Sequence, residues 1–155
     1  MIRSLLLFFA AIALSSASIQ ADSESYQPQV GDIYFQSLHY SPLVATIEGA
    51  TNSPYSHCGI LNLSGGKWVI HEAIGPVRIT PLKDWIQQGV NDEYDVFRLR
   101  EPYREQAYKI LEATELYMGR PYDIQYDFDD EKIYCSELIF KAFRDVFHED
   151  LGEVV

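Results

Sequence analysis

The stretch SHCGILNLSGGKWVIHEA, residues 56–73, contains two apolar runs of strand length separated by a glycine-rich turn. The runs 57–63 and 67–73 flank a Ser-Gly-Gly sequence, and this combination is typical of a β-hairpin. In an antiparallel hairpin the start of the first strand lies beside the end of the second. The sequence therefore predicts that His57 lies close to Glu72.

The rest of the chain predicts short strands and helices around this hairpin. Strands are predicted at 32–38 and 94–100, and helices at 42–50, 81–88 and 102–118. Strands and helices are segregated along the chain rather than strictly alternating. This order favours one α+β domain, an antiparallel sheet with helices packed on it.

Cys135 is predicted to lie in the first turn of a further helix. The apolar residues that follow it recur at helical spacing; they are Leu138, Ile139, Ala142, Phe143 and Val146. Free N–H groups and the positive end of the helix dipole favour a thiolate at such a position, and a thiolate is the nucleophile of acyl transfer. The alternative is a small buried core residue, so a catalytic interpretation requires a base nearby.

Histidine is the candidate base, and the chain has four. His148 lies in a polar stretch and His39 in a loop or helix start, whereas His57 and His71 lie in the predicted hairpin. A base and its orienting carboxylate on adjacent strands, with the nucleophile on a separate helix, form a Cys-His-acid triad. The alternative for a strand histidine is a structural role. The pairing with Glu72 favours His57 as the base.

Cys58 directly follows the proposed base. Neighbouring residues of a strand point to opposite faces, so Cys58 is predicted to be a core residue rather than a second nucleophile. In an oxidising compartment it could also form a disulfide with Cys135. That bond would remove the proposed nucleophile.

These residues carry a resemblance to a known family, because several blocks occur in its order and with similar gaps. The blocks are Gly31 to Gln36, Tyr55 to Gly59, His71 to Val77, Thr80 to Trp85, Gly119 to Asp123 and Tyr134 to Glu137. From Gln27 to about Val146 the chain resembles the YiiX-like, circularly permuted branch of the NlpC superfamily of papain-like cysteine hydrolases. In that branch the histidine and the orienting residue precede the cysteine in sequence.

The resemblance implies a papain-like fold with Cys135 as nucleophile, His57 as general base and Glu72 as the residue that orients His57. It also places Tyr122 where the superfamily often has a tyrosine. Tyr122 would line the site or help to stabilise an oxyanion; the alternative is an aromatic packing residue. Cys58 departs from the family pattern, in which a small or aliphatic residue is expected.

The N-terminus has the pattern of a secretory signal peptide. Arg3 precedes a ten-residue apolar run at 5–14, followed by small and polar residues, and this run is too short to span a bilayer stably. Cleavage is predicted after Ala21, with Ala17 as the alternative site. The sequence therefore predicts a signal peptide at 1–21 and a hydrolase domain at 22–155. After removal of the signal peptide, we expect the domain to be periplasmic or secreted, with no stable membrane span. An uncleaved anchor is the alternative.

The chain is acidic, with a formal net charge of −11 at pH 7, and loss of the signal would remove Arg3 and no acid. Nucleic-acid binding requires a basic surface, so this charge argues against it and against adsorption to anionic polymers or lipids. No metal or cofactor is predicted. A zinc-protease helix would need a histidine where Gly75 stands, the cysteines lack metal-finger spacing, and the acidic run 127–131 lacks the ligand pattern of a calcium loop.

The sequence thus predicts an exported cysteine hydrolase that cleaves an amide bond through a thioester. A peptide or amide substrate is expected, and a peptidoglycan stem peptide fits the predicted location. Two alternatives remain open: a lipid acyl-ester hydrolase or acyltransferase, and a catalytically silent ligand-binding domain on the same fold.

Overall fold

A single antiparallel sheet organises the computed structural model, which describes residues 26–151. Within these residues the sheet has five strands in the order β4-β3-β2-β1-β5, each antiparallel to its neighbours. Their bounds are β1 (Ile33–Gln36), β2 (His57–Ser64), β3 (Lys67–Ala73), β4 (Val77–Pro81) and β5 (Asp95–Phe97).

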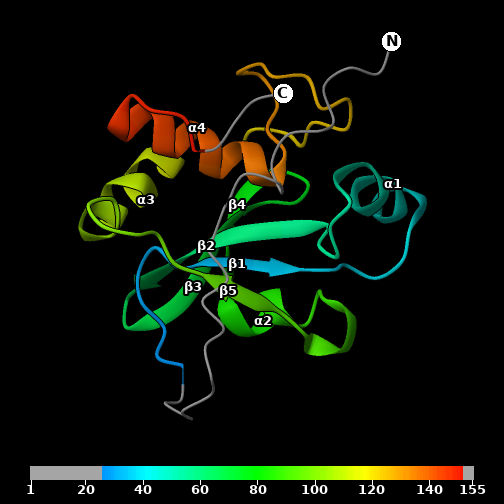
Figure 1. Cartoon of the computed structure of the whole chain (residues 1–155), viewed down its shortest axis with the longest axis horizontal. Helices are drawn as coiled ribbons and strands as arrows, with labels where there is room; N and C mark the ends of the chain where they lie inside the picture. The colour runs from blue at the N-terminus through cyan, green and yellow to red at the C-terminus, as the bar shows by residue number, and fades with distance from the viewer. Residues whose placement is uncertain (1–25, 152–155) are drawn as a thin grey trace.

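Helices cover both faces of this sheet (Figure 1). Their bounds are α1 (Pro42–Thr51), α2 (Leu82–Ile86), α3 (Ala107–Glu115) and α4 (Cys135–Phe147). The helices α3 and α4 pack together on one face, α2 lies against the other, and α1 lies beside the sheet near the end of β1. This arrangement confirms the predicted α+β fold with an antiparallel sheet.

The predicted hairpin is β2 and β3, and its turn explains the glycine pair. Gly65 and Gly66 have φ angles of 57° and 75°, the left-handed values that a two-residue hairpin turn requires and that glycine adopts without steric cost. The register pairs Ser64 with Lys67 beside the turn and Gly59 with Glu72 near the open end. His57 at the start of β2 therefore lies close to the end of β3, as predicted.

Residues of β2 alternate between two apolar layers. Cys58 and Ile60 face α3 and α4 in a cluster of buried residues that also contains Cys135 and Ile139. Leu61 belongs to the layer on the opposite face, which is formed with Tyr34, Ile70 and Trp85 of α2. The sheet thus separates two cores, and the buried apolar side chains of β2 are divided between them.

The start of α4 is fixed by a local hydrogen bond. The carboxylate of Glu137 accepts the backbone N–H of Tyr134 at 3.2 Å, which is half of a capping box. The helix ends where His148 adopts a left-handed φ of 56° and donates its N–H to Arg144 O at 2.8 Å. The predicted helix beginning at Cys135 is confirmed.

Several elements are shorter than the sequence predicts. The predicted strands 32–38 and 94–100 are reduced to Ile33–Gln36 and Asp95–Phe97. The second ends where the Arg98 guanidinium turns to the buried Asp32 carboxylate, at 2.6 Å between Nε and Oδ1.

The helix predicted at 102–118 is regular only in its centre. A 3-10 turn at Arg104–Gln106 precedes α3, and residues 116–118 continue with hydrogen bonds between residues three apart. The strand β4 was not predicted, and it takes up Pro81, so α2 begins one residue later than expected.

The signal peptide predicted at 1–21 lies outside the described residues. Among residues 26–151 no helix is both long and apolar enough to cross a membrane.

Candidate active site

His57 and Glu72 form a buried pair at the open end of the hairpin. The distance between His57 Nε2 and Glu72 Oε2 is 2.6 Å, and the two residues are 1% and 0% exposed. Glu72 belongs to β3 and pairs with Gly59, two residues beyond His57. The period of two in a strand puts both side chains on the same face. The predicted contact between the histidine and the carboxylate is therefore present.

The other oxygen of Glu72 accepts hydrogen bonds from β4 and from the turn after α2. Thr80 Oγ1 and Arg78 Nε of β4 donate to Glu72 Oε1 at 2.5 and 3.1 Å, and Gln88 Nε2 donates at 3.4 Å. Burial by itself raises the pKa of this carboxyl, but the hydrogen bonds from His57, Thr80 and Arg78 and the charge of His57 outweigh it and lower the pKa. Glu72 is thus an anchored carboxylate.

Arg78, Thr80 and Gln88 are residues that sequence reasoning missed as members of the site. Arg78 and Thr80 of β4 alternate with Ile79, which is 47% exposed, so their spacing of two residues is typical of a strand with both side chains on one face. This spacing would have predicted their contact with Glu72 only if a strand had been recognised after the Gly75-Pro76 turn.

The imidazole of His57 lies between the two ionisable partners and against an indole ring. Its ring centroid is 5.8 Å from that of Trp85, and the rings are inclined by 31°. Gly59 of β2 leaves room for the Ile70 side chain of the neighbouring strand, because a Cβ at Gly59 would lie only 2.2 Å from Ile70 Cγ2. With Nε2 engaged by Glu72, Nδ1 is the ring nitrogen left for the hydrogen bond that His57 makes to Cys135.

Burial lowers the pKa of His57, but its hydrogen bonds to Cys135 and Glu72 reverse the effect and raise the pKa to about 9. Both neighbours contribute as anions, and a histidine between two anions retains its proton. The ring is therefore an imidazolium at neutral pH.

Cys135 is the first residue of α4 and lies 5% exposed beneath the surface. A hydrogen bond from the Cys58 thiol lowers its pKa, burial opposes this, and the hydrogen bond and charge of His57 lower it further, so that the pKa lies well below the ordinary value of a thiol. A cysteine with this pKa is a thiolate at neutral pH. The site thus contains a thiolate–imidazolium pair anchored by a carboxylate.

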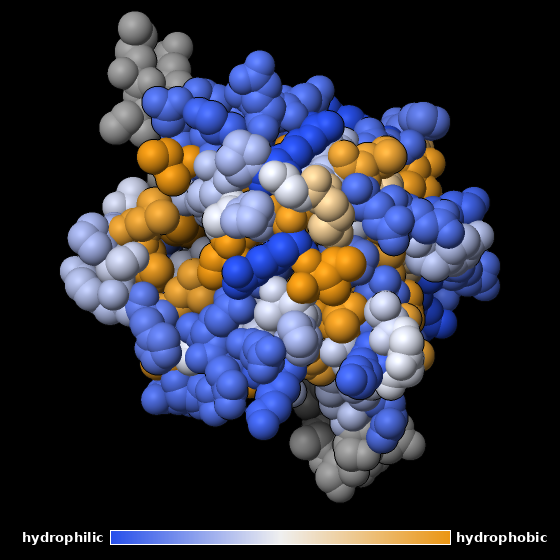
Figure 2. All heavy atoms as spheres, turned by 180° about the vertical axis from the view of Figure 1, so that it is seen from behind, coloured by the Kyte–Doolittle hydropathy of each residue, from blue (hydrophilic) through white to orange (hydrophobic). Residues whose placement is uncertain are grey.

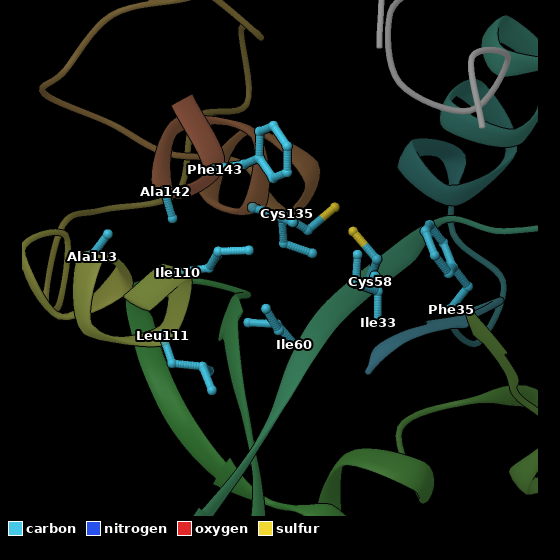
Figure 3. Packing of buried hydrophobic residues seen from close by; sticks show 11 residues of the cluster. Ile33, Phe35, Cys58, Ile60, Ile110, Leu111, Ala113, Cys135, Ala142 and Phe143 are labelled. Carbon is cyan, nitrogen blue, oxygen red and sulfur yellow. The ribbon is translucent and has the colours of Figure 1, made fainter. Parts of the chain in front are cut away.

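Cys58 points away from the His57–Glu72 face, as strand alternation predicts, and lies in an apolar cluster. The same cluster contains Cys135, and the sulfur atoms of the two cysteines point toward each other (Figure 3). Both thiols are free and buried. Alternation predicted the face of Cys58 correctly but could not indicate that the first turn of α4 covers it.

Tyr122 lies in the segment between α3 and α4 and reaches the site. Its side chain hydrogen-bonds to Cys135 and lies 3.5 Å, between hydroxyl oxygens, from Tyr126. Burial, followed by the charge of Cys135, raises the pKa of Tyr122 above that of a free phenol. The hydroxyl therefore keeps its proton and is available as a hydrogen-bond donor.

A pocket of about 220 Å³ lies beside His57 and Tyr122. Its remaining walls come mainly from the segment after β1, from α1 and from the β3–β4 turn. Most of these walls are apolar, and the apolar residues are Leu38, Leu43, Val44, Ile47 and Ile74. In the space-filling view from behind, hydrophobic atoms also break the polar surface at the side of the molecule where α1 lies (Figure 2). The charged groups of Cys135, His57 and Glu72 therefore lie beside a mostly apolar pocket.

The other histidines lie elsewhere. His71 is buried on the opposite face of β3, where Nδ1 is 2.7 Å from Thr114 Oγ1 and Nε2 is 3.2 Å from Asn62 Nδ2. His39 is exposed at the rim of the pocket, and His148 is exposed at the end of α4.

Among the described residues no group of three or more His, Cys, Asp or Glu side chains is arranged to hold a metal ion. In the acidic run 127–131, Asp129 Oδ1 accepts two backbone N–H groups, and Asp130 pairs with Lys141 at 2.7 Å. These carboxylates thus take part in local hydrogen bonds and an ion pair.

The fold and the pairing of cysteine, histidine and carboxylate define a class, the papain-like cysteine hydrolases. A family model for the permuted papain-like amidase enzymes, the YaeF/YiiX, C92 family, matches residues 27–153. The chain therefore belongs to this family, which confirms the resemblance read from its motifs, and it is a cysteine peptidase or amidase.

Two relatives come from Escherichia coli. The uncharacterized protein YiiX of strain K12 is 36% identical over 143 residues, which cover 92% of this chain and 70% of that protein. A crystal structure described as the metalloprotein yiiX from strain O157:H7 superposes with a TM-score of 0.74 at 39% identity, covering 83% of this chain and 71% of that one.

Proposed function

We propose that the chain hydrolyses an amide bond with Cys135 as nucleophile, His57 as general base and acid, and Glu72 as the residue that orients His57. One observation carries this proposal: the continuous series of hydrogen bonds from Cys135 through His57 to Glu72. Membership of a family of cysteine amidases supports the same assignment. A series that only stabilised the fold would not need a buried thiolate and a buried imidazolium side by side, because each buried charge costs free energy.

The reaction proceeds in two steps. The Cys135 thiolate attacks the amide carbonyl, and the imidazolium of His57 donates its proton to the departing amine, leaving an acyl thioester. The neutral imidazole then takes a proton from water, the resulting hydroxide attacks the thioester, and the proton returns to the Cys135 sulfur or stays on the ring. Glu72 stabilises the imidazolium and holds the ring in position in both steps.

Two donors would stabilise the oxyanion that forms on the carbonyl. The backbone N–H of Cys135 lies at the start of α4, where the first N–H groups of a helix have no partner within it. The Tyr122 hydroxyl contacts the sulfur and retains its proton at neutral pH because its pKa is raised.

For the substrate we propose a peptide amide of the cell wall, such as a peptidoglycan stem peptide. The predicted signal peptide at 1–21 would deliver the enzyme to the compartment that contains this polymer. The acidic net charge of −11 would then favour a substrate segment with a free amine over a purely anionic one.

A lipid acyl ester or an acyl amide is the second candidate, and the pocket favours it. Leu43, Val44, Ile47 and Ile74 form a mostly apolar wall beside His57, and such a wall gains free energy by covering an acyl chain. The thioester mechanism is the same for both substrates.

Purified protein incubated separately with peptidoglycan fragments and with phospholipids, with products read by mass spectrometry, decides between these substrates. We expect amide cleavage products that are absent with Cys135→Ala. Fatty acids released by the parent and not by Cys135→Ala would establish the ester enzyme instead. Ligand binding without products and without labelling of Cys135 would contradict both and leave a silent binding domain.

A pocket variant sharpens this choice. Leu43 is 40% exposed and lines the pocket, so Leu43→Asp adds a charge to the pocket wall at a partly exposed position. The variant should lose turnover of an acyl-chain substrate and retain most turnover of a polar peptide. Leu116→Asp, at an exposed apolar residue outside the pocket lining, is the matched control.

A further inference from the structure

Two thiols face each other across the interface between β2 and α4. The Cys58 and Cys135 sulfur atoms point toward each other in the apolar layer beneath the first turn of α4 (Figure 3). Both are free, and both are buried. In the amide hydrolysis proposed above Cys135 is the nucleophile, and Cys58 contributes only a hydrogen bond to the Cys135 sulfur.

The surroundings of the two thiols differ in a way that matters for oxidation. The pKa of Cys135 is lowered well below the ordinary thiol value, chiefly by the hydrogen bond from Cys58 and then by His57. The pKa of Cys58 is raised, first by its hydrogen bond to the Cys135 thiolate and then by burial. Hydroperoxides react with thiolates, so the first oxidation should occur at Cys135.

Once Cys135 is oxidised to a neutral sulfenic acid, the anion that raised the pKa of Cys58 is gone. Cys58 can then lose its proton more easily, and its sulfur already points at the sulfur it must attack. A sulfenic acid that meets a neighbouring thiol condenses to a disulfide, whereas one that does not is open to irreversible oxidation to the sulfinic acid. The position of Cys58 therefore favours the reversible product.

We propose that Cys58 and Cys135 form a redox-active pair, which a hydroperoxide converts reversibly into a disulfide. In the first step the Cys135 thiolate and one proton react with the peroxide to give the sulfenic acid and one molecule of water or alcohol. In the second step the Cys58 sulfur bonds to the Cys135 sulfur and a water molecule leaves. The two thiols lose two electrons and two protons in all, the peroxide is reduced, and a dithiol reductant reverses the bond by exchange.

The disulfide would also switch off the enzyme, a consequence that rests on the proposed function because it requires Cys135 to be the nucleophile. A sulfur in a disulfide is neutral and bonded to a second sulfur, so it cannot act as the thiolate that attacks a carbonyl. The bond would protect the nucleophile during oxidation and return it when a reductant is present.

The test treats the reduced, purified protein with a small excess of hydrogen peroxide and reads intact mass and digested peptides. We expect a loss of the mass of two hydrogen atoms, a crosslinked peptide pair that joins Cys58 to Cys135, and full recovery of the original mass with dithiothreitol. A gain of two or three oxygen atoms on Cys135 in place of that loss would overturn the proposal, as would two thiols that stay unchanged.

Cys58→Ser and Cys58→Ala serve as matched variants. In both, the same peroxide treatment should carry Cys135 to the sulfinic acid, and dithiothreitol should not restore its mass. Reversible protection that persists in either folded variant would contradict a role for Cys58.

Activity is followed in parallel, each variant relative to its own untreated sample. Because the disulfide is detected by mass, a failure of the redox pair and a failure of the amidase assignment give different results. Crosslinking without any Cys135-dependent hydrolysis would support the redox-active pair and contradict the proposed amidase function. Hydrolysis without crosslinking would support the amidase function and contradict the redox-active pair.

Discussion

Two buried histidines lie on the same hairpin, and their surroundings make them chemically different. His57 contacts the carboxylate of Glu72 and the thiol of Cys135, and its pKa is raised to about 9. His71, on the other face of the sheet, contacts the uncharged side chains of Thr114 and Asn62, and burial lowers its pKa. Both side chains are almost fully buried, so the difference between their pKa values comes from the charge of their partners.

The hydrogen bonds of His71 also fix which nitrogen carries its proton. The Thr114 hydroxyl donates to Leu111 O at 2.6 Å, so it accepts from His71 Nδ1–H. His71 Nε2 then accepts from the Asn62 amide. Both nitrogens of this neutral histidine are therefore engaged in hydrogen bonds, and the side chain joins β3 to α3. The two histidines of one hairpin thus differ in charge, and under the proposed mechanism His57 is catalytic whereas His71 is structural.

The largest expected effect distinguishes the two histidines directly. His57→Ala removes the proton donor and acceptor, and such groups contribute about 100- to 10,000-fold to a rate, so kcat/KM should fall by that order. His71→Ala should keep most activity per folded molecule and lower the free energy of unfolding by about 1–3 kcal/mol, because it leaves buried partners unsatisfied. Turnover and urea unfolding of both variants measure this. The opposite pattern would exchange their roles.

A smaller effect is expected at Glu72, the charge that distinguishes His57 from His71. Losing a hydrogen bond to a charged group costs about 1.5–3 kcal/mol, or about 10- to 100-fold in rate, so Glu72→Ala should lose activity by that order. Glu72→Gln should lose less, because the amide oxygen can still accept from His57 Nε2. Full activity in Glu72→Ala would contradict the orienting role.

The pH profile of Glu72→Gln tests the electrostatic part of that role. In the parent the descending limb of kcat/KM should follow loss of the His57 proton, whose pKa is raised to about 9. Removing the carboxylate charge takes away one of the causes that raise this pKa, so the descending limb should move to lower pH. A limb that moved to higher pH, or did not move, would show that Glu72 does not hold the proton on His57.

The smallest effect is expected at Tyr122, which offers one neutral donor. Tyr122→Phe keeps the ring and removes the hydroxyl, and a neutral hydrogen bond is worth about 1 kcal/mol, or about five-fold. The loss should appear in kcat more than in KM if the hydroxyl stabilises the oxyanion. An unchanged kcat would leave Tyr122 as an aromatic packing residue.

Local pattern was sufficient to predict the central pair of the site and the start of α4. The Gly65-Gly66 turn fixes the hairpin register, and that register alone brings His57 to Glu72. The apolar spacing after Cys135 likewise predicted its place at a helix start. These contacts could be foreseen because each depends on residues that are close in sequence or on one strand pairing.

The rest of the site depends on how elements pack, which local pattern does not encode. Arg78 and Thr80 reach Glu72 only because a short strand ending in Pro81 adds to the sheet edge, and Trp85 reaches His57 only because α2 folds under the hairpin. Cys58 shows the limit most clearly. Its face was predictable, but the helix covering that face was not.

The central claim is that Cys135 exists as a thiolate paired with the His57 imidazolium, and alkylation by iodoacetamide as a function of pH tests it most directly. An ordinary thiol has a pKa of about 8.5 and reacts slowly at about pH 6. We expect Cys135 to be alkylated rapidly at that pH, with a rate that changes little up to neutral pH, while Cys58 reacts far more slowly. His57→Ala should reduce this advantage, because it removes one of the groups that lower the pKa of Cys135. Equal, slow alkylation of both cysteines at about pH 6, with rates that rise only near the pKa of a free thiol, would contradict the account.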